Sequence, residues 1–116
     1  GRIFGGFHGV ELPKGKKLEI EDPSAYIFSV SDSKKFLLQK NKAKEAINAH
    51  TSWGPSFGKA NSDIFVAGDF ASENSFTNFG NSYQLPDGMN LEEDSTKSYL
   101  AGSYKFIVAE LEVFQL

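Results

Sequence analysis

The chain has 116 residues, of which 40% are hydrophobic, and this is enough to bury the core of one domain. Its 12 basic and 15 acidic side chains give a formal net charge of -3, so it lacks the basic field that binds a phosphate backbone, and we expect no nucleic-acid partner. No apolar run approaches the roughly 20 residues of a membrane-spanning helix, and with no cysteine there is no disulfide, thiolate nucleophile or cysteine-based metal site.

Short segments rich in Phe, Tyr, Ile and Val, separated by glycines and polar turn clusters, predict an all-β fold. We expect an antiparallel β-sandwich that occupies 1–116 as a single domain and contains at most one or two short helices. The first strand is predicted at 3–7, where Gly5 and Gly6 indicate a bulge or a close backbone approach. Residues 25–30 are apolar on both faces, as in a strand buried between layers, and we expect them to form a central strand.

The middle of the chain alternates between short strands and polar segments. Strands are predicted at 36–38 and 62–67, while 42–49 suits either a strand or a single helical stretch. A long polar stretch covers 68–81. The acidic segment 85–98 contains a Pro-Asp-Gly turn, and we expect it to be a mobile loop.

The longest alternating pattern lies at the C-terminal end and predicts a strand from Tyr104 to Phe114. One face of that strand is expected to point into the core, and it comprises Ile107, Ala109, Leu111 and Val113.

Six segments of the sequence, in the following order, resemble the TLDc domain: 3–7 (IFGGF), 25–30 (AYIFSV), 54–58 (GPSFG), 62–66 (SDIFV), 78–83 (NFGNSY) and 110–114 (ELEVF). The resemblance implies a β-sandwich with one or two short helices and no established catalytic residues. Family members are linked to oxidation resistance, and several bind the vacuolar proton-pumping ATPase. The resemblance therefore implies a cytosolic protein-interaction module.

The resemblance covers the C-terminal part of the family's domain, and the helical and strand elements that precede it there have no counterpart in this sequence. We expect this chain either to associate with such an upstream segment or to cover its exposed sheet edge near 1–7 by forming a homo-oligomer.

Catalytic chemistry has few candidate groups. With only two histidines and no recognisable nucleophile or Walker motif, we expect the chain not to be an enzyme. His8 and His50 are more typical of surface or structural imidazoles than of ligands or bases. Glu110 and Glu112 lie on one side of the last predicted strand, where paired carboxylates would suit glycoside hydrolysis, but a solvated or ion-paired role is favoured.

A candidate cation site lies in the polar stretch that follows the strand at 62–67. Asp69, Glu73 and Asn74 supply the carboxylate and amide oxygens that calcium prefers, although their spacing does not match an EF-hand. Asn, Asp and Ser also favour loops because they bond to their own backbone, and that explanation is favoured over a metal site.

A second candidate site surrounds Trp53, which we place in a turn where a large ring is partly exposed and can stack on the apolar face of a sugar. The polar groups that hydrogen-bond to sugar hydroxyls in a shallow ligand-binding site would come from His50, Asn48 and Asn78. The alternative is that Trp53 closes one end of the sandwich.

These observations favour a small carbohydrate-binding, lectin-like protein, assisted by calcium as the candidate cofactor and made multivalent by oligomerisation. The alternative is a protein-interaction module of the TLDc kind. We expect an extracellular location for the first and a cytosolic one for the second.

Overall fold

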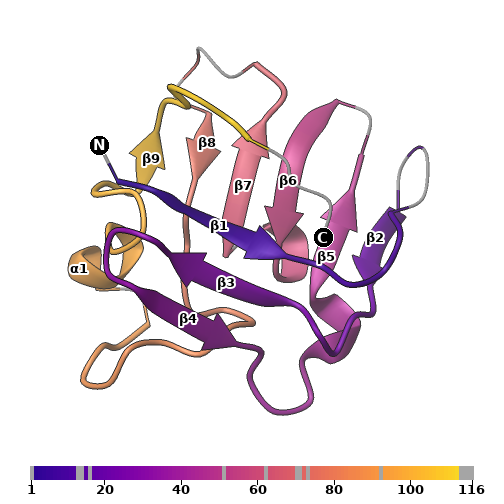
Figure 1. Ribbon diagram of the computed structural model, residues 1–116, viewed down its shortest axis with the longest axis horizontal. Helices are drawn as coiled ribbons and strands as arrows, with labels where there is room; N and C mark the ends of the chain where they lie inside the picture. The colour runs from indigo at the N-terminus through magenta and orange to yellow at the C-terminus, as the bar shows by residue number, and fades with distance from the viewer. Residues whose placement is uncertain are drawn as a thin grey trace.

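The computed structural model describes residues 2–12, 15, 17–50, 52–61, 63–69, 72, 74–91 and 93–112. Its strands form two antiparallel sheets, and Figure 1 shows the smaller sheet crossing in front of the larger one. Their buried faces share one hydrophobic core. The predicted fold class, an antiparallel β-sandwich with little helix, is therefore confirmed.

The smaller sheet has three strands in the order β1–β3–β4. Their bounds are Phe4–Phe7 for β1, Tyr26–Ser29 for β3 and Lys34–Leu37 for β4. The central position of β3 agrees with the prediction for residues 25–30. Only its inner face is fully buried, however, because Ile27 and Ser29 alternate with the half-buried Tyr26 and Phe28. The expectation that this strand is enclosed on both faces is wrong, since no second layer covers its outer face among the described residues.

The larger sheet has six strands in the order β2–β5–β6–β7–β8–β9. Segment 42–49 contains both predicted alternatives, a 3-10 turn followed by a strand. Two of these strands were not predicted: β2, and β6, which begins at Trp53. The bounds are β2 Lys17–Ile20, η1 Ala43–Glu45, β5 Ile47–Ala49, β6 Trp53–Phe57, η2 Lys59–Asn61, β7 Ile64–Ala67, β8 Ser75–Phe76, α1 Asp94–Lys97 and β9 Lys105–Phe106.

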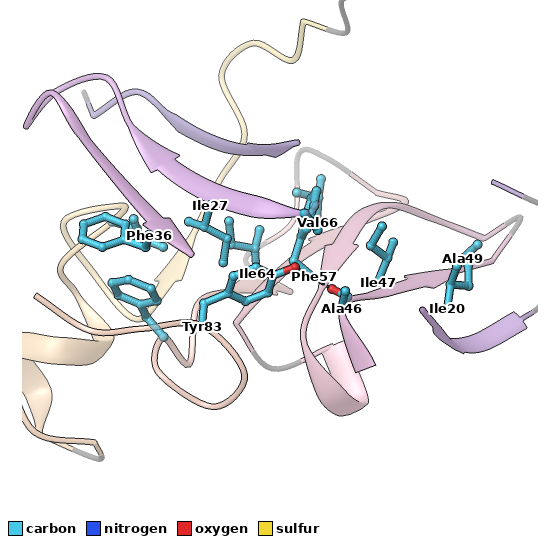
Figure 2. Close-up of a cluster of buried hydrophobic side chains, with 13 residues drawn as sticks. Ile20, Ile27, Phe36, Ala46, Ile47, Ala49, Phe57, Ile64, Val66 and Tyr83 are labelled. Carbon is cyan, nitrogen blue, oxygen red and sulfur yellow. Dashed lines mark hydrogen bonds between the residues drawn. The ribbon is translucent and has the colours of Figure 1, made fainter. Parts of the chain in front are cut away.

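The core lies between the two sheets and includes the side chains shown in Figure 2. Gly6 of β1 explains how the layers approach, since a Cβ built there would lie 2.4 Å from Cζ of Phe57 in the other sheet. The ring of Phe57 packs directly on the backbone of β1 for this reason. Pairing of β1 with β3 is continuous from Phe4 to Phe7, so the two glycines mark a close approach rather than a bulge.

The C-terminal segment differs from the predicted strand. The strand predicted from Tyr104 to Phe114 is limited to β9, because β8 offers it only two residues as a partner. Ile107 is 53% exposed and Leu111 is 39% exposed, while Phe106 and Val108, on the opposite parity, pack against the core. The predicted core set of Ile107, Ala109 and Leu111 is therefore wrong, and Val113 lies outside the described residues.

The segment predicted as a mobile loop, 85–98, contains α1 and contributes the buried Thr96, whose Oγ1 donates to the Asn90 carbonyl at 2.6 Å. Among the described residues, no helix has the length and apolar character needed to cross a membrane.

Candidate interaction surface

Trp53 and His50, two members of the predicted ligand-binding set, are in contact. Their rings stack with centroids 4.3 Å apart, and the Trp53 ring also meets Phe65 edge-on at 5.5 Å. The His50 Nδ1 accepts the Ser52 backbone N–H at 2.9 Å. One face of the indole is therefore covered by the imidazole and is not open to a sugar. The Trp53 Nε1 is buried and has no hydrogen-bond partner among the described residues.

Asn48 and Asn78 lie apart from that stack. Asn48 is buried, its Oδ1 accepts the Glu19 N–H at 3.0 Å, and its Nδ2 donates to the Gly58 carbonyl at 2.6 Å. The Asn78 Oδ1 is also buried, and no hydrogen bond joins it to any residue that the structure describes. Among the interactions of the described residues, only the stack of His50 on Trp53 joins two members of the predicted ligand-binding set.

Two of the predicted calcium ligands, Asp69 and Asn74, are described, and Ser72 bonds to both of them. Ser72 donates from both its backbone N and its Oγ to the Asp69 carbonyl, at 3.2 and 2.8 Å, and its Oγ accepts the Asn74 N–H at 3.3 Å. Asp69 and Asn74 are exposed, and Glu73 lies outside the described residues. No group of three or more His, Asp or Glu side chains in the described part of the chain is arranged to hold a metal ion.

The smaller sheet has an outer face that was not predicted as a site. One row across the three strands consists of Phe7, Tyr26 and Leu37, which lie opposite one another. Two residues further along the strands, a second row consists of Gly5, Phe28 and Lys35. Because Ile27 points into the core, these two rows point away from it. We call this surface the outer face, and it comprises Phe7, Tyr26, Phe28, Lys35 and Leu37.

Contacts between rings organise the outer face. Phe7 and Tyr26 stack at 5.0 Å, and the Tyr26 and Phe28 centroids lie 6.3 Å apart. The Lys35 Nζ sits 4.4 Å from the centre of the Tyr26 ring, a cation–π distance. Leu37 is 51% exposed beside them. The result is a partly exposed apolar surface that carries a positive charge.

Asp22 positions one end of this sheet. Its side chain is buried between the segment after β1 and the start of β3, where it accepts the N–H groups of Gly9 at 2.6 Å and Val10 at 3.3 Å. Its other oxygen accepts the backbone N–H and the Oγ–H of Ser24, at 2.9 and 2.6 Å. Burial opposes the charged form, but these bonds outweigh it, so the pKa of Asp22 lies below its usual value.

Asp63 holds a loop at the β4 edge of the same sheet. It accepts the backbone N–H groups of Gly80 at 3.1 Å, Ser82 at 2.8 Å and Tyr83 at 3.2 Å. The loop that it holds pairs in turn with the end of β4, through the bridge between Leu38 and Tyr83. Burial raises the pKa of Asp63 to about 7, even though the backbone bonds act to lower it.

The fold places the chain among the all-β sandwich domains. A family model described as the TLDc domain matches residues 1–116, and the chain therefore belongs to the TLDc family. Neither a comparison with curated proteins nor one with solved structures finds a match. The family match agrees with the resemblance drawn from the sequence and favours protein interaction. Carbohydrate and calcium binding gain no support from it and stay predictions.

Proposed function

We propose that this chain is a non-enzymatic protein-interaction module and that its outer face contacts the partner. The outer face carries the proposal, because it presents aromatic and aliphatic side chains next to a lysine on a rigid sheet. Aromatic residues on rigid supports are typical anchors of protein interfaces.

The chemistry of the partner follows from the charge of this face. Lys35 is exposed, and no ion pair joins it to a carboxylate among the described residues. A complementary surface would present carboxylates beside apolar side chains. The resemblance to TLDc implies the vacuolar proton-pumping ATPase as a partner, so the purified ATPase is the first protein to test.

The non-enzymatic part of the proposal is supported by the positions of the candidate catalytic groups. The His8 Nδ1 lies 2.8 Å from the Val10 carbonyl and His50 stacks on Trp53. Glu110 and Glu112 lie outside the strands and are exposed, so they lack the shared strand face on which a catalytic pair was considered.

The experiment measures binding of the chain to the purified ATPase by surface plasmon resonance. Leu37→Asp places an unpaired charge on the outer face and should weaken binding about tenfold or more. Leu91→Asp is the matched control, because Leu91 is 46% exposed against 51% for Leu37 but belongs to a different part of the molecule. Equal binding by both variants, or no binding by the parent chain, would contradict the proposal.

Lys35→Glu tests the charge. It should weaken binding most at low salt, since screening reduces the contribution of an exposed charge. Weakening that is the same at every salt concentration would show that Lys35 acts through packing rather than charge.

A further inference from the structure

Three cations lie against aromatic rings among the described residues, and they differ in whether the cation has another partner. The Arg2 guanidinium lies 5.9 Å from the centre of the Tyr99 ring, but it also forms an ion pair with Asp32. The Lys97 Nζ lies 5.2 Å from the centre of the Tyr104 ring, and Lys97 takes part in a further interaction. Neither Arg2 nor Lys97 is therefore free of other interactions.

Lys35 on β4 is the third such cation. Its Nζ lies 4.4 Å from the centre of the Tyr26 ring, and the side chain is exposed. No hydrogen bond or ion pair joins this Nζ to an acceptor in the part of the chain that the structure describes. An ammonium carries three N–H donors and the face of the ring offers it no lone pair, so these donors are available to an acceptor on another molecule.

The hydroxyl of Tyr26 is a second available donor. Tyr26 lies on the middle strand of the smaller sheet, with β1 on one side and β4 on the other (Figure 1). Phe7 of β1 stacks on its ring at 5.0 Å and Lys35 of β4 approaches from the other side, so the two faces of the ring are covered. The hydroxyl at the edge of the ring bonds to no described residue and is not a buried atom, so it reaches solvent.

These two donors can meet one carboxylate. Because Nζ of Lys35 lies 4.4 Å from the centre of the ring that carries the hydroxyl, one carboxylate oxygen can accept from Nζ while the other accepts from Oη. Apolar groups border the pair, since the Phe28 ring lies 6.3 Å from the Tyr26 ring and Leu37, opposite Tyr26 in register, is 51% exposed. An anion bound there would lose part of its water, which strengthens its bonds to both donors.

We propose that Tyr26 and Lys35 together bind one carboxylate, supplied by an Asp or Glu side chain that the partner presents between apolar residues. The inference rests on the proposed function and names the group of the partner that the outer face recognises. Charge favours a carboxylate, because the single charge of Lys35 balances it, whereas a phosphoryl group carries about −1.5 to −2 at neutral pH. The stack on Phe7 holds the Tyr26 ring, so the hydroxyl keeps its position relative to Nζ.

A short peptide tests the pair without the ATPase. The probe is an acetylated and amidated pentapeptide with one glutamate between leucines, and NMR titration of the labelled chain follows its amide shifts. The Tyr26 and Lys35 amides should shift in a saturable way, and a peptide with glutamine in place of glutamate should bind about tenfold more weakly. Equal binding of the two peptides, or no shift of these amides up to about 10 mM peptide, would overturn the proposal. Tighter binding of a peptide with phosphoserine at this position would overturn the choice of a carboxylate.

Tyr26→Phe isolates the hydroxyl, because phenylalanine keeps the ring, the stack on Phe7 and the contact with Lys35. It should weaken binding of the chain to the purified ATPase and to the glutamate peptide about tenfold. Tyr104→Phe is the matched control, since Tyr104 is 40% exposed, also lies against a lysine and belongs to another part of the molecule. Equal binding by Tyr26→Phe and the parent chain would contradict the role of the hydroxyl, and a merely structural role of Tyr26 predicts that result.

A double-mutant cycle tests whether both donors hold the same carboxylate. Tyr26→Phe and Lys35→Gln are measured singly and together against the glutamate peptide, and shared binding predicts a combined loss smaller than the product of the two single losses. Additive free energies would mean two separate contacts and would overturn the pair. If the peptide binds this pair and the ATPase does not bind the chain, the proposed function fails and the inference about the carboxylate stands. If the ATPase binds and Leu37→Asp weakens it while Tyr26→Phe does not, the proposed function stands and the pair fails.

Discussion

Asp22 and Asp63 are both buried aspartates that hold a loop through backbone N–H groups, yet their pKa values move in opposite directions. Asp22 has a lowered pKa, and that of Asp63 is raised to about 7. The donors explain the difference. Gly9 and Ser24, which bond to Asp22, are exposed, whereas Gly80, Ser82 and Tyr83, which bond to Asp63, are buried. The number of bonds is similar, so the depth of the site decides which protonation state is favoured.

The two aspartate sites also differ in the part of the smaller sheet that each one holds. Both sites are connected to η1, because the Asp22 N–H donates to the Ala43 carbonyl at 3.0 Å and the Tyr83 Oη donates to the Ala46 carbonyl at 2.8 Å. Asp22 fixes the segment that follows β1, and Asp63 fixes the loop that covers the end of β4. Loss of either aspartate should therefore affect a different edge of the same sheet.

Truncation of the two carboxylates should have the largest effect and should separate them most clearly. Asp63→Ala leaves three buried N–H groups without an acceptor and should cost about 5 kcal/mol of unfolding free energy, enough to threaten folding. Asp22→Ala should cost about 2 kcal/mol, because water can reach the exposed N–H groups of Gly9 and Ser24. Urea denaturation measures both, and equal losses would contradict the role given to depth.

The pH dependence of stability should have opposite signs at the two sites. The pKa of Asp63 is about 7 in the folded chain against 3.8 for an unperturbed group, so the folded state holds this proton more tightly. Its stabilising contribution is complete below about pH 4 and is lost as the pH rises toward 7. At about 1.4 kcal/mol per pKa unit, the change amounts to about 4 kcal/mol.

Asp22 has a lowered pKa, so its contribution is present above the ordinary aspartate range and is lost as the pH falls through the lowered value. Urea denaturation between pH 3 and pH 8 should show that Asp63→Asn removes the decline toward pH 7. Asp22→Asn should remove the decline at the acid end instead. A parent curve that rises from pH 4 to pH 7, and that Asp63→Asn leaves unchanged, would refute the assignment for Asp63.

Each aspartate site is also bounded by a glycine, which allows a finer test. A Cβ at Gly58 would lie 2.0 Å from the Asp63 Oδ1, and one at Gly9 would lie 2.4 Å from the Ser24 Oγ. Gly58→Ala should cost about 3 kcal/mol and Gly9→Ala about 1 kcal/mol, because the Ser24 hydroxyl can rotate away while the Asp63 carboxylate cannot.

Gly88→Ala serves as the control for backbone strain. Gly58 and Gly88 both have positive φ, +93° and +83°, but nothing lies within 4 Å of a Cβ at Gly88. Its substitution should cost only about 1 kcal/mol. Thermal unfolding measures the three variants, and a loss at Gly88 as large as that at Gly58 would mean that strain, not the contact with Asp63, sets the cost.

The smallest effect concerns the connection to η1. Tyr83→Phe removes the Tyr83 Oη–H donor to the buried Ala46 carbonyl and should cost about 1 kcal/mol. Ser24→Ala, which removes the Oγ–H donor to Asp22, should cost no more than that, because Ser24 is exposed and keeps its backbone bond. Chemical denaturation of the two variants compares these single bonds.

Several features of the fold could be predicted from local sequence. The strands at β1, β3, β4 and β7 were expected from short apolar runs between turn residues. Gly5 and Gly6 indicated a close approach, which the contact of Phe57 with Gly6 confirms. Segment 42–49, for which either a strand or a helical stretch was predicted, contains a 3-10 turn followed by β5.

The candidate site was less predictable. Trp53 and His50 do meet, because they are near in sequence and close across a strand end. The outer face was missed because Phe7, Tyr26 and Leu37 come from three strands and join only through their register. Asp22 was missed too, although an Asp followed two residues later by Ser is a local sign of an Asx turn.

The sequence by itself determined the class of sheet, the position of most strands and the membership of the TLDc family, since these depend on composition, local periodicity and the order of motifs. Only the tertiary structure decided which face of each strand is buried, because alternation defines two faces without choosing between them. The C-terminal segment shows this, with Phe106 and Val108 packed inward and Ile107 outward. The tertiary structure also brought buried N–H donors from residues 80–83 to Asp63, because hydrogen-bond partners depend on segments that are far apart in the chain.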